Sequence, residues 1–293
     1  MTAAFTFHTG NGTPLAGTLF EPAVQRGAAT HPVLIASALG VPQRFYAAFA
    51  GWLAQRGHRV MTFDLSGMAA SRQAQHRHSL KGMKADMLSW ARQDFAAAVA
   101  HLAGSSADGR VKLIGHSLGL HHAAMTNAVT QGCIAHAVGV AAGAGYWRDW
   151  ASASRRKAPL LMHVAGPLLT PLLGWFPGKR LGMVADLPAG VMLQWSRWCR
   201  HPQFAWGAQP ELVLPSLQAA RFTVSAFAFS DDEAMTEACS RKLLAALPNA
   251  PSSLRVLRPA DVGLAAIGHL GAFKPGAAAL WPTFESALGD AVM

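Results

Sequence analysis

The segment around Ser117 contains residues whose types and spacing allow nucleophilic chemistry. Ser117 lies between two glycines, in the order Gly115-His116-Ser117-Leu118-Gly119. A serine hydroxyl is a poor nucleophile unless it is held exposed and close to a base. A G-x-S-x-G sequence achieves this by placing the serine on a strained turn between a strand and a helix, which pass too close for a Cβ at either glycine. We therefore take Ser117 as the candidate nucleophile.

The sequence on both sides of Ser117 fits such a turn. Residues 111–114 (VKLI) are typical of a short buried strand, and residues 121–129 (HHAAMTNAV) are compatible with a helix. The N-terminus of that helix would direct partial positive charge at the serine. A chance match is the alternative in a chain with 28 glycines, but the strand before and the helix after the motif argue against it.

A serine nucleophile needs a histidine base, and the histidine needs a carboxylate that fixes its tautomer. Of the 13 histidines, His269 is favoured because glycines flank it and it lies between the last predicted strand and the last predicted helix. The other candidates near the serine, His116, His121 and His122, are too close to it in sequence, and we expect them in elbow packing or at the surface.

The carboxylate has three candidates. Asp232 is favoured because it lies a few residues beyond the predicted strand that ends near Phe229. Asp231 is adjacent, and Asp149, which follows the preceding strand, is the third. The alternative role for the Asp231-Asp232 pair is to cap a helix that we predict from Glu233 onward.

Two backbone N–H groups would complete the site by stabilising a negative oxygen in the transition state. The first is expected from Leu118, directly after the serine, and the second from Val41, in the loop after the predicted strand at residues 32–37.

Strand and helix patterns alternate along the chain, after a predicted hairpin around Asn11-Gly12. We expect strands at residues 32–37, 59–64, 111–114, 135–142, 221–229 and 253–258, and helices at residues 45–56, 86–102, 233–247 and 277–288. This alternation predicts an α/β fold with a mostly parallel sheet and helices on both faces. The loops carrying the candidate residues follow strands, so they should meet at one edge of the sheet.

Residues 146–215 interrupt this pattern and contain six of the nine tryptophans. We predict a mainly helical cap insertion there, between a first core part (residues 1–145) and a second (residues 216–293). The content of Trp, Leu and Met favours an apolar pocket wall, although any single tryptophan is more often part of the cap's own core.

Composition narrows the class of partner. The chain is 51% hydrophobic and 14% charged, with a net charge of +10, so it can bury a large core and favours anionic partners. The densest basic runs, residues 155–157 and 179–180, are too short for a nucleic-acid stripe. We expect a small-molecule ester-type substrate and no nucleic acid, with a homodimer as an open alternative.

The cysteines and the hydropathy of the chain bear on the cellular compartment in which the protein is expected. Cys133, Cys199 and Cys239 are odd in number and far apart, which suits a reducing environment and gives neither a disulfide framework nor a zinc site. The N-terminus shows no secretory signal. Residues 158–176 are the most lipid-like, but we expect three prolines and a histidine to break this stretch, which argues against an integral membrane span. We expect a cytoplasmic protein.

The chain resembles the α/β-hydrolase superfamily over almost its whole length. The resemblance rests on Leu39-Gly40, FDLSGMAAS, GHSLG, Asp232 and His269, in the family's order of serine, acid and histidine. More closely, the segments LGVPQRFYAAFAGWLAQRG, GYWRDW, FPGKRLGMVADLPAGVMLQWSRWCRHP, FSDDEAMT and IGHLGAFK resemble bacterial predicted hydrolases near the serine-aminopeptidase and monoacylglycerol-lipase-like branch. Ser66 and Leu120 depart from residues common in the superfamily (Arg and Gly). The resemblance implies a catalytic triad and a cap, and no particular substrate.

These features predict a serine hydrolase that cleaves a carboxylic ester of a largely apolar acyl or aryl substrate through an acyl-enzyme. A thioester or an amide would use the same residues. The alternative is a catalytically silent fold that binds a ligand or partner. No cofactor or metal is expected: His76 and His78 lie in a polar loop, and Gly143-Ala144-Gly145 lacks the third glycine of a dinucleotide loop, where Arg148 stands.

Overall fold

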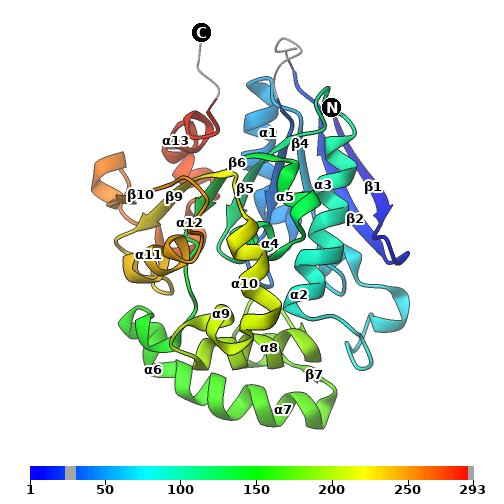
Figure 1. Cartoon of the computed structure of the whole chain (residues 1–293), viewed down its shortest axis with the longest axis vertical. Helices are drawn as coiled ribbons and strands as arrows, with labels where there is room; N and C mark the ends of the chain where they lie inside the picture. The colour runs from blue at the N-terminus through cyan, green and yellow to red at the C-terminus, as the bar shows by residue number, and fades with distance from the viewer. Residues whose placement is uncertain (24–30, 290–293) are drawn as a thin grey trace.

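The computed structural model describes residues 1–23 and 31–289, and an eight-stranded sheet lies at its centre (Figure 1). Across the sheet the strands are β1 (Thr2–His8), β2 (Pro14–Phe20), β4 (Val60–Phe63), β3 (Val33–Ala36), β5 (Val111–His116), β6 (Ile134–Val140), β9 (Thr223–Phe229) and β10 (Ser252–Leu257). The first two strands form the predicted antiparallel hairpin, β2 pairs antiparallel with β4, and all other neighbours are parallel. The predicted α/β fold with a mostly parallel sheet is confirmed.

The central strands are mostly apolar because both faces of the sheet are covered. Every residue of β3, β4 and β5 is buried. Successive side chains of a strand point to opposite faces, so Leu34 and Leu113 belong to one core, and Ile35 and Ile114 belong to the other. The first core lies under α3 (Ala96–Ala103) and α4 (Leu118–Met125), and the second lies under α1 (Ala47–Gln55) and α13 (Trp281–Ser286).

Three predicted helices differ in detail from the observed ones. The helix at residues 86–102 consists of α2 (Met87–Ser89), a π-helical turn (Trp90–Phe95) and α3. The last helix begins as a 3₁₀ segment (Pro275–Leu280) before α13. The helix predicted from Glu233 begins later, as α11 (Glu237–Ala245), because the Thr236 side chain caps it by accepting from the Cys239 N–H. Residues 231–235 are therefore a loop, which bears on the site below.

The segment between β6 and β9 is mainly helical, as predicted. It contains α6 (Ser152–Pro159), α7 (Gly166–Leu173), α8 (Ala189–Arg200), α9 (Phe204–Ala208), α10 (Pro210–Ala219) and a short ribbon of β7 (Trp175–Phe176) and β8 (Leu187–Pro188). In Figure 1, α6 and α7 lie along the edge of the molecule farthest from the sheet. The division of the chain at residues 146 and 215 stays a prediction, and residue 215 falls within α10, which packs against α4.

The expectation that prolines break residues 158–176 is wrong. Helix α6, a π-helical segment (Leu160–Ala165) and α7 follow one another without a gap, from Ser152 to Leu173. Pro167 has no N–H to donate along this helix. The carbonyl of Met162, five residues earlier, instead accepts from the buried Ser196 Oγ at 2.6 Å. Among the described residues, no helix is long and apolar enough to cross a membrane.

Candidate active site

Ser117 lies on the strained turn that its flanking glycines predict. It connects β5 to α4 with φ 51° and ψ −110°, a backbone region that costs energy for any residue other than glycine. Its N–H donates to the Val140 carbonyl at 2.8 Å, which ties the turn to the neighbouring strand. A Cβ at Gly115 would lie 2.6 Å from the backbone of α4, and one at Gly119 would lie 2.2 Å from the Ala36 carbonyl oxygen. Both glycines are therefore required by close packing.

The three predicted side chains meet at the carboxyl edge of the sheet. His269 Nε2 lies 3.1 Å from Ser117 Oγ, and His269 Nδ1 lies 2.8 Å from Asp232 Oδ2. The Asp232 side chain is 1% exposed and that of His269 is 14% exposed. With Nδ1–H donated to the carboxylate, the free Nε2 can accept the serine proton. The order and direction of these hydrogen bonds are those that nucleophilic catalysis needs.

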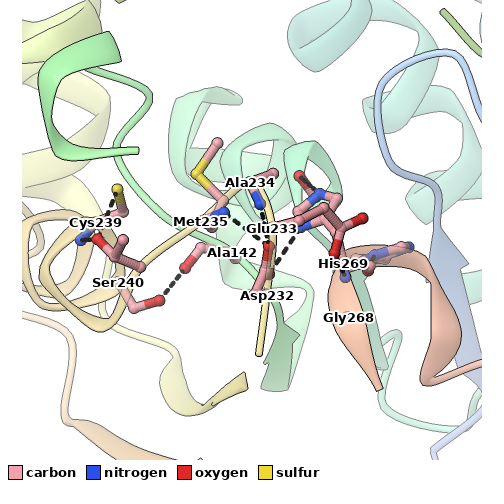
Figure 2. Close-up of polar contacts among 12 residues, drawn as sticks. Ala142, Asp232, Glu233, Ala234, Met235, Cys239, Ser240, Gly268 and His269 are labelled. Carbon is pink, nitrogen blue, oxygen red and sulfur yellow. Dashed lines mark hydrogen bonds and ion pairs between the residues drawn. The ribbon is translucent and has the colours of Figure 1, made fainter. Parts of the chain in front are cut away.

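The loop after β9 folds around the Asp232 carboxylate. Its second oxygen, Oδ1, accepts from the N–H of Ala234 at 2.7 Å and from that of Met235 at 2.8 Å (Figure 2). Both oxygens are thus used within a buried environment, and the side chain has one orientation. The alternative of a helix cap is wrong for Asp232, since Thr236 caps α11.

The two alternative acids, Asp231 and Asp149, form hydrogen bonds or ion pairs with other groups. Asp231 Oδ2 accepts from the N–H of Ile267 at 2.7 Å and from that of Gly268 at 3.1 Å. Asp149 forms an ion pair with Lys242. The carboxylate on His269 Nδ1 is that of Asp232, while Asp231 shapes the backbone just before His269.

Glu233 also holds the histidine loop, and the sequence analysis did not single it out. Its Oε2 accepts from the His269 N–H at 2.8 Å. A Cβ at Gly268, where φ is +61°, would lie 2.8 Å from the same oxygen. The glycine before His269 therefore serves both the backbone turn and the approach of Glu233. The only sequence signal was the run of three acidic residues that begins at Asp231.

A buried chain of hydrogen bonds connects the loop after β3 to the carbonyl of His269. The Ala38 N–H donates to Tyr46 Oη at 2.9 Å, and Tyr46 Oη lies 2.8 Å from His116 Nδ1. The His269 carbonyl can only accept a hydrogen bond, so the neutral His116 carries its proton on Nε2, and its Nδ1 accepts from the Tyr46 hydroxyl. His116 Nε2 donates to the His269 carbonyl at 2.8 Å. Tyr46 was not predicted, since it lies 70 residues from its partner.

The three histidines around the elbow are packing residues. His121 Nε2 donates to the Gly143 carbonyl at 2.9 Å, and His122 packs against the Phe95 ring. Burial lowers the pKa of His116 to about 3, that of His121 to about 4 and that of His122 to about 3. All three are neutral at pH 7, and the alternative of a surface position is wrong.

His122→Leu is expected to weaken the pH dependence of stability. The pKa of His122 is about 3 in the folded chain and about 6.5 when unfolded. Unfolding therefore takes up a proton below about pH 6.5, and the stabilisation present above that pH is lost as the pH falls toward the folded pKa. The variant removes about 1.4 kcal/mol per pH unit from the slope of the unfolding free energy between roughly pH 6 and pH 4. Urea unfolding at a series of pH values measures this slope for the wild type and the variant.

A cavity of about 370 Å³ opens above Ser117 and His269, which both line it. Its floor comes from loops at the edge of the sheet and its roof from residues of the segment between β6 and β9. The apolar side chains of the wall include Leu39, Met87, Trp150, Met183, Leu187, Trp195 and Phe204. A substrate bound at the serine would therefore lie in a mostly apolar chamber.

Comparison with known proteins was made by sequence and by structure. No protein-family model and no curated protein matches the sequence. Solved structures match it over nearly its whole length. The α/β hydrolase GrgF from Penicillium sp. sh18 has 18% identity and a TM-score of 0.61, with 98% of both chains covered. A hydrolase from Oleispira antarctica has 14% identity and a TM-score of 0.59, with 94% of both covered. The thioesterase domain from the curacin biosynthetic pathway has 14% identity and a TM-score of 0.56, covering 98% of this chain and 99% of that one.

This chain has the α/β-hydrolase fold. The predicted resemblance is confirmed at that level, and the more specific branch of bacterial predicted hydrolases stays a prediction. Within this fold, the glycines at 143 and 145 are explained by close packing. A Cβ at Gly143 would lie 2.6 Å from Cys239 Cβ, and one at Gly145 would lie 2.7 Å from the Phe204 ring.

The two backbone N–H groups predicted to bind the oxyanion, those of Leu118 and Val41, differ in their hydrogen bonds. Leu118 is the first residue of α4, where backbone N–H groups have no partner within the helix. The Val41 N–H donates to the Ala38 carbonyl at 3.0 Å and closes a tight turn. A substrate oxyanion would compete with the Ala38 carbonyl for the Val41 N–H. The assignment of Leu118 and Val41 as oxyanion donors stays a prediction. Across the part of the chain that the structure describes, no cluster of metal-ligating side chains occurs.

Proposed function

We propose that this protein is a serine hydrolase that cleaves a carboxylic ester of a largely apolar acyl or aryl substrate. The observation that carries the proposal is the pair of contacts from His269 to Ser117 Oγ at 3.1 Å and to Asp232 Oδ2 at 2.8 Å. In the proposed reaction, Ser117 attacks the carbonyl carbon while His269 takes the serine proton. His269 then gives that proton to the leaving oxygen, and water releases the acyl group by the same steps in reverse order.

The surroundings of the serine support the reaction class. The first turn of α4 directs partial positive charge and the Leu118 N–H at the site where an oxyanion would form. The apolar cavity wall favours an uncharged acyl or aryl group. Similar solved structures include a hydrolase and a thioesterase domain, so a thioester is the nearest alternative substrate. A cytoplasmic location and activity without a cofactor stay predictions.

Hydrolysis of p-nitrophenyl esters tests the proposal. Esters from acetate to long acyl chains should be cleaved, with one optimum of chain length set by the cavity. An ester of similar length that ends in a carboxylate should be cleaved more slowly, because the cavity wall is mostly apolar and includes the acidic residue Glu233. A fluorophosphonate probe should label the chain. If no ester is cleaved and the probe does not react, the alternative of a silent binding module replaces the enzyme.

The Tyr46 hydroxyl is expected to position the proposed base. In Tyr46→Phe, His116 Nδ1 loses its hydrogen-bond donor, so the imidazole that donates to the His269 carbonyl is held less firmly. We expect kcat to fall roughly 10- to 100-fold with KM nearly unchanged, since the base is misplaced and the pocket is not altered. Tyr146→Phe changes the other tyrosine and should keep wild-type kcat. An equal fall in both variants, or a change in KM alone, contradicts the positioning role.

A further inference from the structure

Large apolar side chains form a line on the outer face of the helix from Ser152 to Leu173. Leu160, Val164, Leu168 and Leu172 are 67%, 45%, 59% and 81% exposed. They recur at every fourth residue, so they lie on one side of the helix and form what we call the outer stripe. Contiguous apolar surface of this kind marks an interaction site in soluble domains.

The opposite side of the same helix is fully packed. A second line of four residues faces inward toward α8 and is buried: Ala158, Met162, Gly166 and Thr170. A Cβ at Gly166 would lie 2.5 Å from the Met192 side chain. Apolar residues therefore occupy both sides of this helix, whereas a surface helix usually has a polar outer side. The leucines of the outer stripe therefore contribute nothing to the core.

Cations flank the outer stripe at both ends. Residues 150–185 carry Arg155, Arg156 and Lys157 before it and Lys179 and Arg180 after it, and contain no Asp or Glu. All five basic side chains belong to exposed residues. An apolar helix face bordered by Lys and Arg matches the interface of an anionic bilayer, where leucines enter the acyl boundary and cations meet lipid phosphates.

Two further exposed apolar residues follow the helix in sequence, and one of them reaches the cavity. Leu181 and Val184 are 49% and 51% exposed, and Val184 also lines the cavity above Ser117. Its neighbours Met183 and Ala185 line the same cavity. Helices α6 and α7 form the edge of the molecule farthest from the sheet (Figure 1), so a flat surface could contact this edge without meeting the core.

We propose that the outer stripe and its flanking basic residues dock this protein on the surface of an anionic phospholipid bilayer. The helix from Ser152 to Leu173 then lies in the plane of the interface, and the cavity faces the lipid side, where an amphiphilic substrate would partition. The docking does not depend on the proposed catalytic roles, whereas the delivery of substrate to Ser117 rests on the proposed function.

Sedimentation with lipid vesicles tests the docking, since it requires no turnover. The full chain is mixed with vesicles of phosphatidylcholine alone or of phosphatidylcholine with phosphatidylglycerol. We expect binding to the anionic vesicles, weaker binding as salt is raised, and at least tenfold weaker binding to the neutral vesicles. No binding to the anionic vesicles would overturn the proposal.

Two sets of variants locate the contact. Leu168→Glu with Leu172→Glu should weaken binding to anionic vesicles at least tenfold, because charge replaces the apolar face. Replacing Arg155, Arg156 and Lys157 by glutamine should weaken it roughly 100-fold. Both sets should keep the wild-type melting temperature and the wild-type rate on a water-soluble ester.

The matched control is Val129→Glu, which introduces the same charge at an 82% exposed valine on α5 (Ala128–Gly132). This variant should bind vesicles almost as the wild type does. Vesicle binding that survives in the Leu168 and Leu172 variant would overturn the proposal. So would a stable dimer on gel filtration that the same variant converts to a monomer, because a second copy of the chain would then cover the outer stripe.

Discussion

Ser117→Ala is expected to lower kcat on the best ester substrate by roughly 10⁶-fold, the loss that follows removal of the nucleophile from an intact triad. The variant lacks the Oγ that lies 3.1 Å from His269 Nε2, so no acyl-enzyme can form there. The elbow should keep its geometry, since the alanine Cβ takes the place of the serine Cβ at the same φ of 51°. Steady-state hydrolysis and loss of fluorophosphonate labelling measure the effect.

Ser154→Ala is the matched control for this variant, because Ser154 is a second serine that lines the cavity. Its hydroxyl donates to the Glu233 carbonyl and does not contact His269 Nε2. Activity of Ser154→Ala should stay within about tenfold of the wild type. If the Ser117 variant retained labelling and turnover, the nucleophile would be another residue and the proposed mechanism would be wrong.

Local sequence patterns predicted the strands and the elbow because their causes are local. A strand that is buried on both faces must be apolar, as β3 is. The glycines around Ser117 are dictated by the backbone a few residues away and by β3, so a short motif contains the requirement. The same holds for His269, whose preceding glycine has a positive φ. Residues of this kind can be predicted from one sequence.

The contacts that position His269 could not be predicted in this way. Tyr46 ends the 3₁₀ turn (Gln43–Tyr46) before α1, and it meets His116 at the end of β5 only in the folded chain. Neither residue type signals the pairing. Ser196, from α8, donates to the Met162 carbonyl in the part of the helix where Pro167 has no N–H, and this partner cannot be found from the local sequence. The start of α11 was misplaced for a similar reason, since Asp232 is used by His269 rather than as a helix cap.

Asp232→Asn is expected to lower kcat by roughly 10⁴-fold while KM changes little. The asparagine oxygen can still accept from the N–H groups of Ala234 and Met235, as Oδ1 does now. Its amide group then faces His269 Nδ1 and acts as a donor. The histidine is forced into the tautomer with its proton on Nε2, so it cannot accept the serine proton, and the cation that forms in the transition state loses its counter-charge.

The adjacent residue gives a control with the same change of charge and shape. Asp231→Asn can still accept from the N–H of Ile267 and Gly268 through its amide oxygen, so we expect kcat within about tenfold of the wild type and a modest loss of stability. The kinetics of the two variants thus separate a triad acid from a loop-positioning carboxylate. Only the carboxylate on His269 Nδ1 selects the productive tautomer, so a catalytic role predicts a much larger fall in kcat for Asp232→Asn than for Asp231→Asn. An equal fall in kcat for the two variants would mean that the contact between His269 and Asp232 is structural.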